Sequence, residues 1–294
     1  MTFNDDSQLS GGKVRRRGRT TGIAVGGGAV GVVVLALLSQ LLGVNLSGLG
    51  EVFGGGGSSP EGVTSTAVAC DSGADANTQV DCRLEGAAES LDRYWGEQTP
   101  TLGVAYTTPT GVDLFEDSTT TGCGSATAAV GPFYCPPDRT IYLDTDFFDE
   151  LRTRFDTSGG SLAQMYILAH EWGHHIQNLT GAMESADRSG TGPESDSVRL
   201  ELQADCFAGA WVGDASTVPD ETGTPYLKPV TAQEYQDALG AAAAVGDDRI
   251  QEQATGTVDP EGWTHGSAEQ RQRWFQAGFE GDATSCDTFA AAQL

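Results

Sequence analysis

The sequence predicts an α+β fold, in which a mainly helical domain with a small sheet follows one transmembrane helix and a Gly/Ser-rich tether. Long helical patterns at residues 161–181 and 193–211 predict the helices, and short runs rich in Val, Ile, Leu and Tyr predict the strands. An uncharged stretch near the N-terminus predicts the membrane segment. We therefore expect a basic cytoplasmic tail at 1–21, a transmembrane anchor at 22–44, a flexible linker at 45–66 and a globular domain at 67–294.

The predicted anchor reads GIAVGGGAVGVVVLALLSQLLG over residues 22–43, and no charge occurs between Arg19 and Glu51. About 20 such residues span the hydrocarbon core of a bilayer as a helix. Basic residues precede the segment, so the positive-inside rule predicts a single pass through the cell membrane, with the globular domain extracytoplasmic. A cleaved signal peptide is the alternative, but its apolar region is normally shorter and no A-x-A-like site is clear.

The remainder of the chain is acidic. The whole chain carries a formal net charge of −25, although residues 1–21 hold five Lys and Arg against two Asp. Such an acidic body argues against nucleic acid as a partner. The simplest interpretation of the acidic surface is solubility.

All six cysteines follow the predicted membrane segment. An even number of cysteines on the outer side of a membrane indicates disulfides in an oxidising compartment. The short spacings suggest the pairs Cys70–Cys82 and Cys123–Cys135, which leaves Cys206 to pair with Cys286. None of them has the C-x-x-C spacing of a zinc knuckle or redox motif.

Shorter patterns fill in the globular domain. We expect helices at 87–95 and 144–155, and capping boxes at Thr231 and Ser267 open two more. The expected strands are 102–107, 112–115 and 141–144. A strand at a sheet edge could pair with an extended peptide, and 141–144 is the candidate edge.

The predicted helix 161–181 has one apolar stripe, formed by Leu162, Met165, Ala169, Trp172 and Ile176, and Gly181 is its expected C-terminal stop. The helix contains His170-Glu171-Trp172-Gly173-His174, an H-E-x-x-H pattern. Residues four apart lie on one face of a helix, so the two histidines can bind one metal ion. Glu171 lies close enough to reach a water on that ion. This is the arrangement of zinc metalloproteases. His175 faces away from the pair, so we expect a surface residue or an outer-shell residue there.

A catalytic zinc site needs a third protein ligand. Glu201 and Asp205 form an E-x-x-x-D pattern on the predicted helix 193–211, so one carboxylate could bind zinc while the other accepts the outer N–H of a histidine ligand. This pair is preferred over the other downstream candidates, Glu184, Glu194, Asp196 and His265.

Several separated motifs together resemble the bacterial neutral zinc metallopeptidase family: HEWGHHIQ, ELQADCFAGAW, GPFYCPPDRTIYLD and THGSAEQRQRWF. The resemblance spans roughly residues 84–289 and implies a gluzincin-like, zincin-type domain. It also implies that His170, His174 and Glu201 bind one Zn²⁺ per chain, that Glu171 is the base and that Asp205 supports a histidine. The pairings Cys123–Cys135 and Cys206–Cys286 follow from it as well.

The expected reaction is peptide-bond hydrolysis by a membrane-anchored endopeptidase. Zinc lowers the pKa of its bound water to about 7, and Glu171 would take a proton from that water and deliver it to the leaving amine. A second electrophile is usually needed for the oxyanion. His265 is the candidate, with Tyr226 and Tyr235 as rivals. The alternative function is a metal-stabilised extracytoplasmic binding or scaffold protein without turnover, and imidazole ligands also suit other metals.

Overall fold

The computed structural model describes residues 2–18, 65–154 and 157–294. Its main sheet has five strands in the order β2-β1-β3-β7-β6, and a separate hairpin is formed by β4 and β5. β1 and β3 run parallel, as do β3 and β7, whereas the outer strands β2 and β6 are antiparallel to their neighbours. The strands are Val14–Arg17 (β1), Ser65–Ala67 (β2), Gly111–Phe115 (β3), Ser118–Thr121 (β4), Gly124–Thr127 (β5), Phe133–Cys135 (β6) and Thr140–Asp144 (β7).

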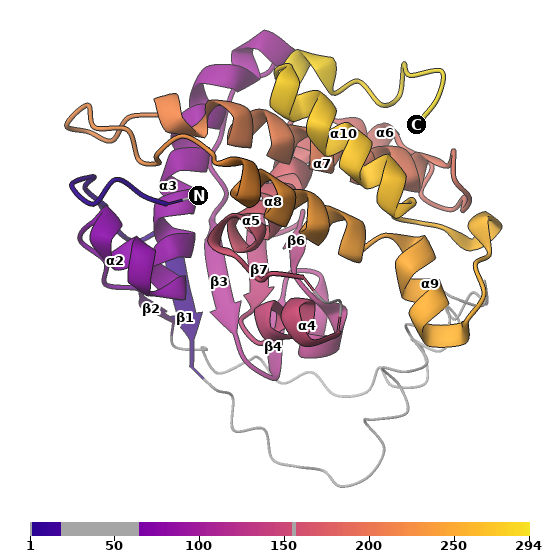
Figure 1. The fold of residues 1–294 in the computed structure, drawn as a ribbon, viewed down its shortest axis with the longest axis horizontal. Helices are drawn as coiled ribbons and strands as arrows, with labels where there is room; N and C mark the ends of the chain where they lie inside the picture. The colour runs from indigo at the N-terminus through magenta and orange to yellow at the C-terminus, as the bar shows by residue number, and fades with distance from the viewer. Residues whose placement is uncertain (1, 19–64, 155–156) are drawn as a thin grey trace, which may run out of the picture.

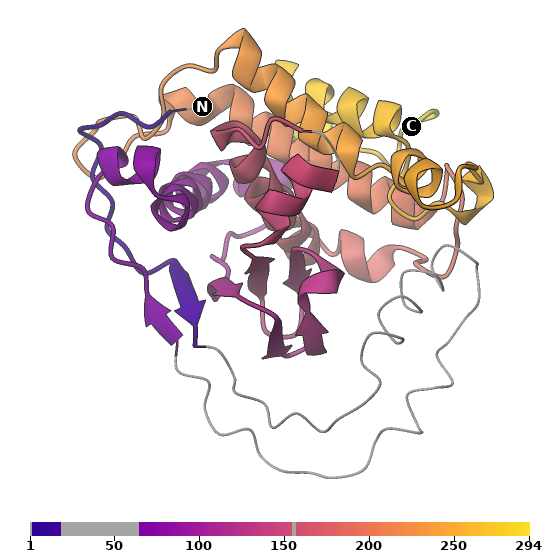
Figure 2. The same cartoon turned by 60° about the horizontal axis from the view of Figure 1, so that its bottom comes forward.

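Most of the helices gather on one side of this sheet (Figure 2). They are Gly73–Thr78 (α2), Val80–Gln98 (α3), Phe147–Arg154 (α4), Ser161–Thr180 (α5), Ala182–Ser185 (α6), Asp196–Asp214 (α7), Ala232–Ala244 (α8), Asp247–Thr255 (α9) and Ala268–Glu280 (α10). Helix α5 packs against α3, α7 and α8 and also touches β6 and β7, which places it between the sheet and the outer helices (Figure 1).

The two faces of the sheet have different surroundings. Val112 and Leu114 of β3 and Ile141 and Leu143 of β7 belong to the large apolar core beneath the helices. The alternating residue Tyr142 packs in a small cluster with Phe115, Cys135 and Phe133. The period-two alternation of the strands therefore decides which side chains reach the helical core.

Helix α5 begins and ends close to the predicted positions. Its N-cap is Gly160, and its C-cap Gly181 adopts a left-handed conformation with φ of 79°. Positive φ is accessible to glycine without a steric penalty, so Gly181 stops the helix as predicted. The predicted apolar stripe of Leu162, Met165, Ala169, Trp172 and Ile176 is fully buried.

Glycines allow the helices that carry the polar site to approach closely. A Cβ on Gly173 of α5 would lie 2.9 Å from the Cα of Ala204 on α7, and a Cβ on Gly278 of α10 would lie 1.9 Å from the carbonyl oxygen of Cys206. Any side chain at these positions would push the helices apart. These two glycines therefore allow α7 to pack closely against α5 on one side and α10 on the other.

Other expected elements differ from the observed ones. Helix α3 covers 19 residues, where only 87–95 was expected. Residues 102–107 form no strand. Instead, the Tyr106 hydroxyl donates a hydrogen bond to Asp92 of α3, and the Thr107 carbonyl accepts one from His175. β7 is an interior strand, since it pairs with β3 on one side and β6 on the other. The predicted edge at 141–144 is therefore wrong, and the two edge strands are β6 and β2.

The N-terminal residues correct the predicted membrane-anchored arrangement. β1 precedes the predicted anchor, yet it shares one sheet with β2 and β3, which follow it. A single pass between a cytoplasmic tail and an extracytoplasmic domain is incompatible with that pairing. Within the described ranges, no helix is long and apolar enough to cross a membrane. The predicted anchor at 22–44 and linker at 45–66 lie outside those ranges.

Residues 2–17 are held by specific contacts. Phe3 is fully buried in the core. Glu85 and Glu89, one turn apart on α3, each accept two hydrogen bonds from backbone N–H groups within residues 10–14. Basic side chains that were predicted to belong to a tail are paired instead: Arg15 and Arg17 both form ion pairs with the buried Asp113. These two positive charges therefore neutralise a buried carboxylate of the domain.

All three disulfides are those expected. Cys70 pairs with Cys82, Cys123 with Cys135, and Cys206 with Cys286. The third bond closes the longest loop, with a sequence separation of 80, and ties the C-terminal loop to α7.

Candidate metal centre

The side chains of His170, His174 and Glu201 converge where α5 and α7 pack together. The Nε2 atom of His170 lies 3.2 Å from Glu201 Oε2, and the Nε2 atom of His174 lies 3.5 Å from Glu201 Oε1. Two ligands bound at about 2.0–2.1 Å in a tetrahedral site lie about 3.3 Å apart. The donor types and spacings therefore fit a zinc ion. Among the described residues, His170, His174 and Glu201 are the group of His, Cys, Asp or Glu side chains close enough together to hold a metal ion.

Asp205 lies on the other side of the His170 ring. Its Oδ1 atom is 2.8 Å from His170 Nδ1, so this ring nitrogen carries the proton and donates to the carboxylate. The Nε2 atom then faces Glu201. Burial alone would lower the pKa of His170, but the neighbouring Asp205 and Glu201 carboxylates raise it to about 10. Without a metal, Nε2 therefore also carries a proton and donates to Glu201, and a metal cation bound there would take the place of that proton.

Asp205 is itself surrounded by buried donors. Arg271 of α10 donates to it from Nε at 2.8 Å and from Nη2 at 3.0 Å, and the Tyr166 hydroxyl donates to Oδ1 at 2.5 Å. Burial would raise the pKa of Asp205, but Arg271 and His170 lower it. The carboxylate therefore stays ionised and fixes the His170 ring.

His174 is oriented by an amide rather than a carboxylate. Its Nδ1 atom lies 2.8 Å from Gln177 Oε1, one turn further along α5. An amide oxygen only accepts, so Nδ1 of His174 donates and Nε2 is available towards Glu201. The Gln177 side chain is fully buried.

Glu171 lies at the same site with 6% of its surface exposed. Burial raises the pKa of its carboxyl, while His174 and His170 oppose that effect. A carboxylate with a raised pKa is a suitable general base near neutral pH. Among the described residues, none donates a hydrogen bond to the Glu171 carboxylate.

His265 lines the same cleft, which has a volume of about 600 Å³. Its Nδ1 atom lies 3.1 Å from Asp247 Oδ1, and its side chain remains 40% exposed. Burial opposes protonation, but the Asp247 hydrogen bond and the Glu201 charge raise the pKa of His265 above its ordinary value of 6.5. An imidazolium held through Nδ1 presents its Nε2–H to the cleft.

The remaining predicted candidates lie elsewhere. Tyr226 is buried and donates to Glu89, and Tyr235 packs on Phe275 and Phe279. Neither lines the cleft. The other acidic candidates do not reach the histidines: Glu194 pairs with Arg199, Asp196 accepts from the backbone of Asp187, and Glu184 is exposed on α6.

His175 differs from the expected surface or outer-shell residue. It is fully buried, its Nδ1 lies 2.9 Å from the Tyr134 hydroxyl, and its Nε2 donates to the Thr107 carbonyl at 2.6 Å. Burial lowers its pKa. His175 is therefore a neutral bridge that joins α5 to β6 and to the loop before β3.

Two site residues were missed by the sequence analysis, Arg271 and Gln177. A signal for Arg271 exists, because Ala268, Arg271, Phe275 and Gly278 recur at steps of three and four and are all buried. An arginine within an apolar stripe indicates a buried ion pair. Gln177 follows His174 by three residues, which places both on one face.

A buried H-E-x-x-H helix with a glutamate from a second helix is the arrangement of residues typical of zinc metallopeptidases. The sequence profile described as "Putative neutral zinc metallopeptidase" matches residues 3–289, and the chain belongs to this family. Similar proteins include the uncharacterized protein Rv2575 of Mycobacterium tuberculosis, 53% identical over 227 residues, which are 76% of either chain. The uncharacterized protein YpfJ of Escherichia coli is 41% identical over 203 residues, 66% of either chain. No solved structure matches.

Proposed function

We propose that this protein is a zinc-dependent endopeptidase. The observation that carries the proposal is the buried Glu171 beside a His170–His174–Glu201 donor set in one cleft. These three side chains would hold the ion. When bound there, zinc would polarise a peptide carbonyl and lower the pKa of a water.

The chain's own residues would carry the proton transfers. Glu171 accepts a proton from the attacking water at a carboxylate oxygen and delivers it to the amide nitrogen that leaves. The Nε2–H of His265 donates a hydrogen bond to the oxyanion that develops on the carbonyl oxygen. Asp205 and Gln177 keep the two histidine rings in the orientation that binding requires.

The substrate class is an extended polypeptide segment. β6 is the edge strand of the main sheet nearest the candidate site, and Phe133 and Tyr134 of β6 line the cleft together with the preceding residues 128–132. An edge strand offers unpaired backbone groups to an added strand. Val130, 59% exposed, and Phe147 of α4 add apolar surface beside this edge. A peptide paired with β6 would pass the H-E-x-x-H helix.

The proposal is tested with the purified full chain, its disulfides intact, and an unstructured protein such as casein. We expect about one zinc per chain and cleavage that stops when a chelator removes the metal and returns when zinc is added back. Cleavage that persists in the metal-free protein would contradict the mechanism. Bound zinc without cleavage of any extended substrate would instead support a metal-stabilised binding protein.

The assigned role of His265 predicts a specific kinetic effect. His265→Ala should lower kcat by about 10²-fold, since an oxyanion donor is lost, while zinc content stays unchanged. In the unmutated protein kcat should fall as the pH rises through the raised pKa of His265, because deprotonation removes the Nε2–H.

Matched controls for His265 are the two tyrosine rivals. Tyr226→Phe and Tyr235→Phe should leave kcat unchanged, because neither hydroxyl reaches the cleft. An unchanged kcat for His265→Ala, or an alkaline decline that survives in that variant, would show that another group stabilises the oxyanion.

A further inference from the structure

Three hydrogen bonds lead from His174 away from the candidate metal centre. His174 Nδ1 donates to Gln177 Oε1 at 2.8 Å, and Gln177 Nε2 lies 3.2 Å from Gln203 Oε1 on α7. Gln203 Nε2 in turn donates to the Cys286 carbonyl at 2.9 Å. All three bonds point the same way, from the imidazole to the C-terminal loop. Aligned hydrogen bonds of this kind polarise one another.

The orientation of each amide is fixed by its partners. Gln177 Nε2 also donates to the Leu200 carbonyl at 2.6 Å, next to the ligand candidate Glu201. A reversed Gln177 amide would place its oxygen against this carbonyl and leave His174 without an acceptor. Gln177 is fully buried and Gln203 is 9% exposed, so water offers little substitute.

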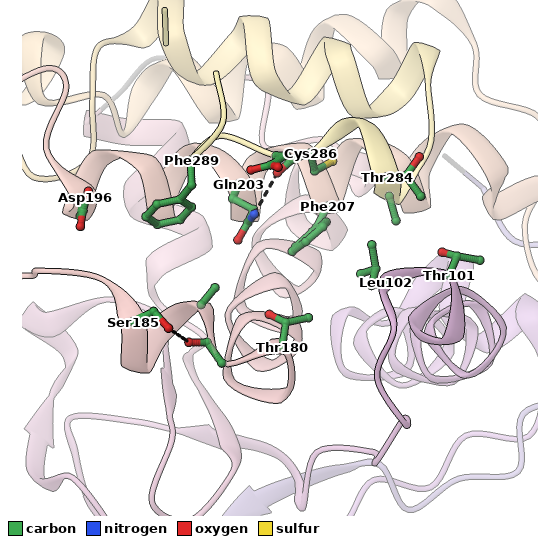
Figure 3. Close-up of a pocket in the computed structure, with 14 residues that line it drawn as sticks. Thr101, Leu102, Thr180, Ser185, Asp196, Gln203, Phe207, Thr284, Cys286 and Phe289 are labelled. Carbon is green, nitrogen blue, oxygen red and sulfur yellow. Dashed lines mark hydrogen bonds between the residues drawn. The ribbon is translucent and has the colours of Figure 1, made fainter. Parts of the chain in front are cut away.

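The far end of this chain of amides is covalently anchored. Cys286 is bonded to Cys206 of α7, which holds the C-terminal loop beside Gln203. Gln203 also lies on the wall of a second pocket of about 540 Å³, formed by α7, the C-terminal loop and residues near 101 and 180 (Figure 3). The metal centre is thus linked to a region outside the substrate cleft.

We infer that Gln177 and Gln203 are positioning residues that set the tautomer and orientation of His174, and that the disulfide-bonded C-terminal loop contributes to metal binding through them. The inference rests on the proposed role of His174 as a metal ligand. The arrangement contrasts with His170, whose outer nitrogen meets the charged Asp205–Arg271 pair. His170 is therefore oriented by a charged carboxylate, and His174 by hydrogen bonds through two neutral amide side chains.

The first test needs no substitution. In the metal-free full chain, ¹⁵N NMR of the histidine side chains should show His174 protonated on Nδ1 when the ring is neutral. The Nε2–H tautomer would overturn the inference. This measurement is independent of hydrolysis, so it also distinguishes failure of the inference from failure of the proposed peptidase activity.

The second test uses zinc affinity, measured by competition with a chelator. Gln177→Met should weaken zinc binding by about 10–100-fold, the usual effect of losing an outer partner of a ligand. Gln203→Met should weaken it by a smaller factor, about 10-fold, at the low end of that scale. In both variants the neutral His174 ring should become a mixture of tautomers.

The matched control is Gln272→Met. Gln272 of α10 is half-buried and donates to the Leu239 carbonyl, so its loss removes a comparable hydrogen bond away from the site. Its zinc affinity and His174 tautomer should equal those of the unmutated protein. If Gln203→Met lowers only thermal stability, as Gln272→Met would, the C-terminal loop has no part in metal binding and the inference is overturned. An unchanged affinity in Gln177→Met would overturn it as well.

Discussion

Glu171→Gln is expected to lower kcat by about 10²–10⁴-fold, the contribution of a positioned general base and acid, while the protein keeps its zinc. The amide has the same shape but accepts no proton from water. Glu171 also lies outside the donor group of His170, His174 and Glu201, so metal binding should persist. The measurement is casein or peptide cleavage together with metal content on the same samples.

Two further variants complete this test. Glu201→Ala should lose zinc, and cleavage with it, because a donor atom is removed from the centre. Glu184→Gln changes an exposed carboxylate of α6 and should alter neither quantity. Cleavage at the unmutated rate by Glu171→Gln would exclude this residue as the base, and full zinc content in Glu201→Ala would require a different third ligand.

Arg271→Leu is expected to lower the free energy of unfolding by about 3–5 kcal/mol, the usual cost of removing one partner of a buried ion pair. The side chains of Arg271 and Asp205 are 3% and 0% exposed, so Asp205 would be left charged in the interior. Urea denaturation of the zinc-free protein at pH 7 measures the effect without metal linkage. The control is Arg249→Leu on α9, whose side chain is exposed.

The pH dependence of stability gives an independent check on the same pair. The pKa of Asp205 is lowered in the folded protein, so its stabilising contribution is present above its ordinary pKa of about 3.9 and is lost as pH falls through the lower folded value. Arg271→Leu should reduce this acid-dependent loss. If urea denaturation shows that Arg271→Leu lowers the free energy of unfolding by less than about 1 kcal/mol, a value typical of exposed ion pairs, water must reach Asp205.

The grouping of side chains at the candidate metal centre could be predicted largely because the spacing within each pair is local. The steps from His170 to His174 and from Glu201 to Asp205 are each one helical turn, and a helix converts such a step into one face. The apolar stripe of the first helix and Gly181 at its end marked the helix itself. The need for a third zinc ligand joined the two pairs. The resemblance of several motifs to a known family then assigned Glu201 as the ligand and Asp205 as the partner of a histidine.

The missed contact of Arg271 with Asp205, and that of Gln177 with Gln203, both join different helices. Arg271 reaches Asp205 because α10 crosses α7 at Gly278, and Gln203 reaches Gln177 because Gly173 lets α7 approach α5. Periodicity within one segment does not specify such crossings. The sheet order has the same origin: residues 141–144 were recognised as a strand, but their interior place depends on pairing with distant segments.

The predicted membrane-anchored arrangement was wrong for a related reason. The cluster of basic residues at 13–19 was interpreted as a separate tail because of its composition. In the structure, Arg15 and Arg17 both pair with Asp113, which lies nearly one hundred residues later in the chain. A charge run carries no information about a distant buried carboxylate.

The N-terminal strand has a practical consequence for handling this protein. A truncated version that starts at Ser65 would lack β1, so β3 would become an unprotected sheet edge, open to aggregation by strand addition. It would also leave a void where the Phe3 ring is buried, and such voids destabilise a core. Glu85 would lose the backbone donors that it accepts from. Biochemical work should therefore retain residues 2–18.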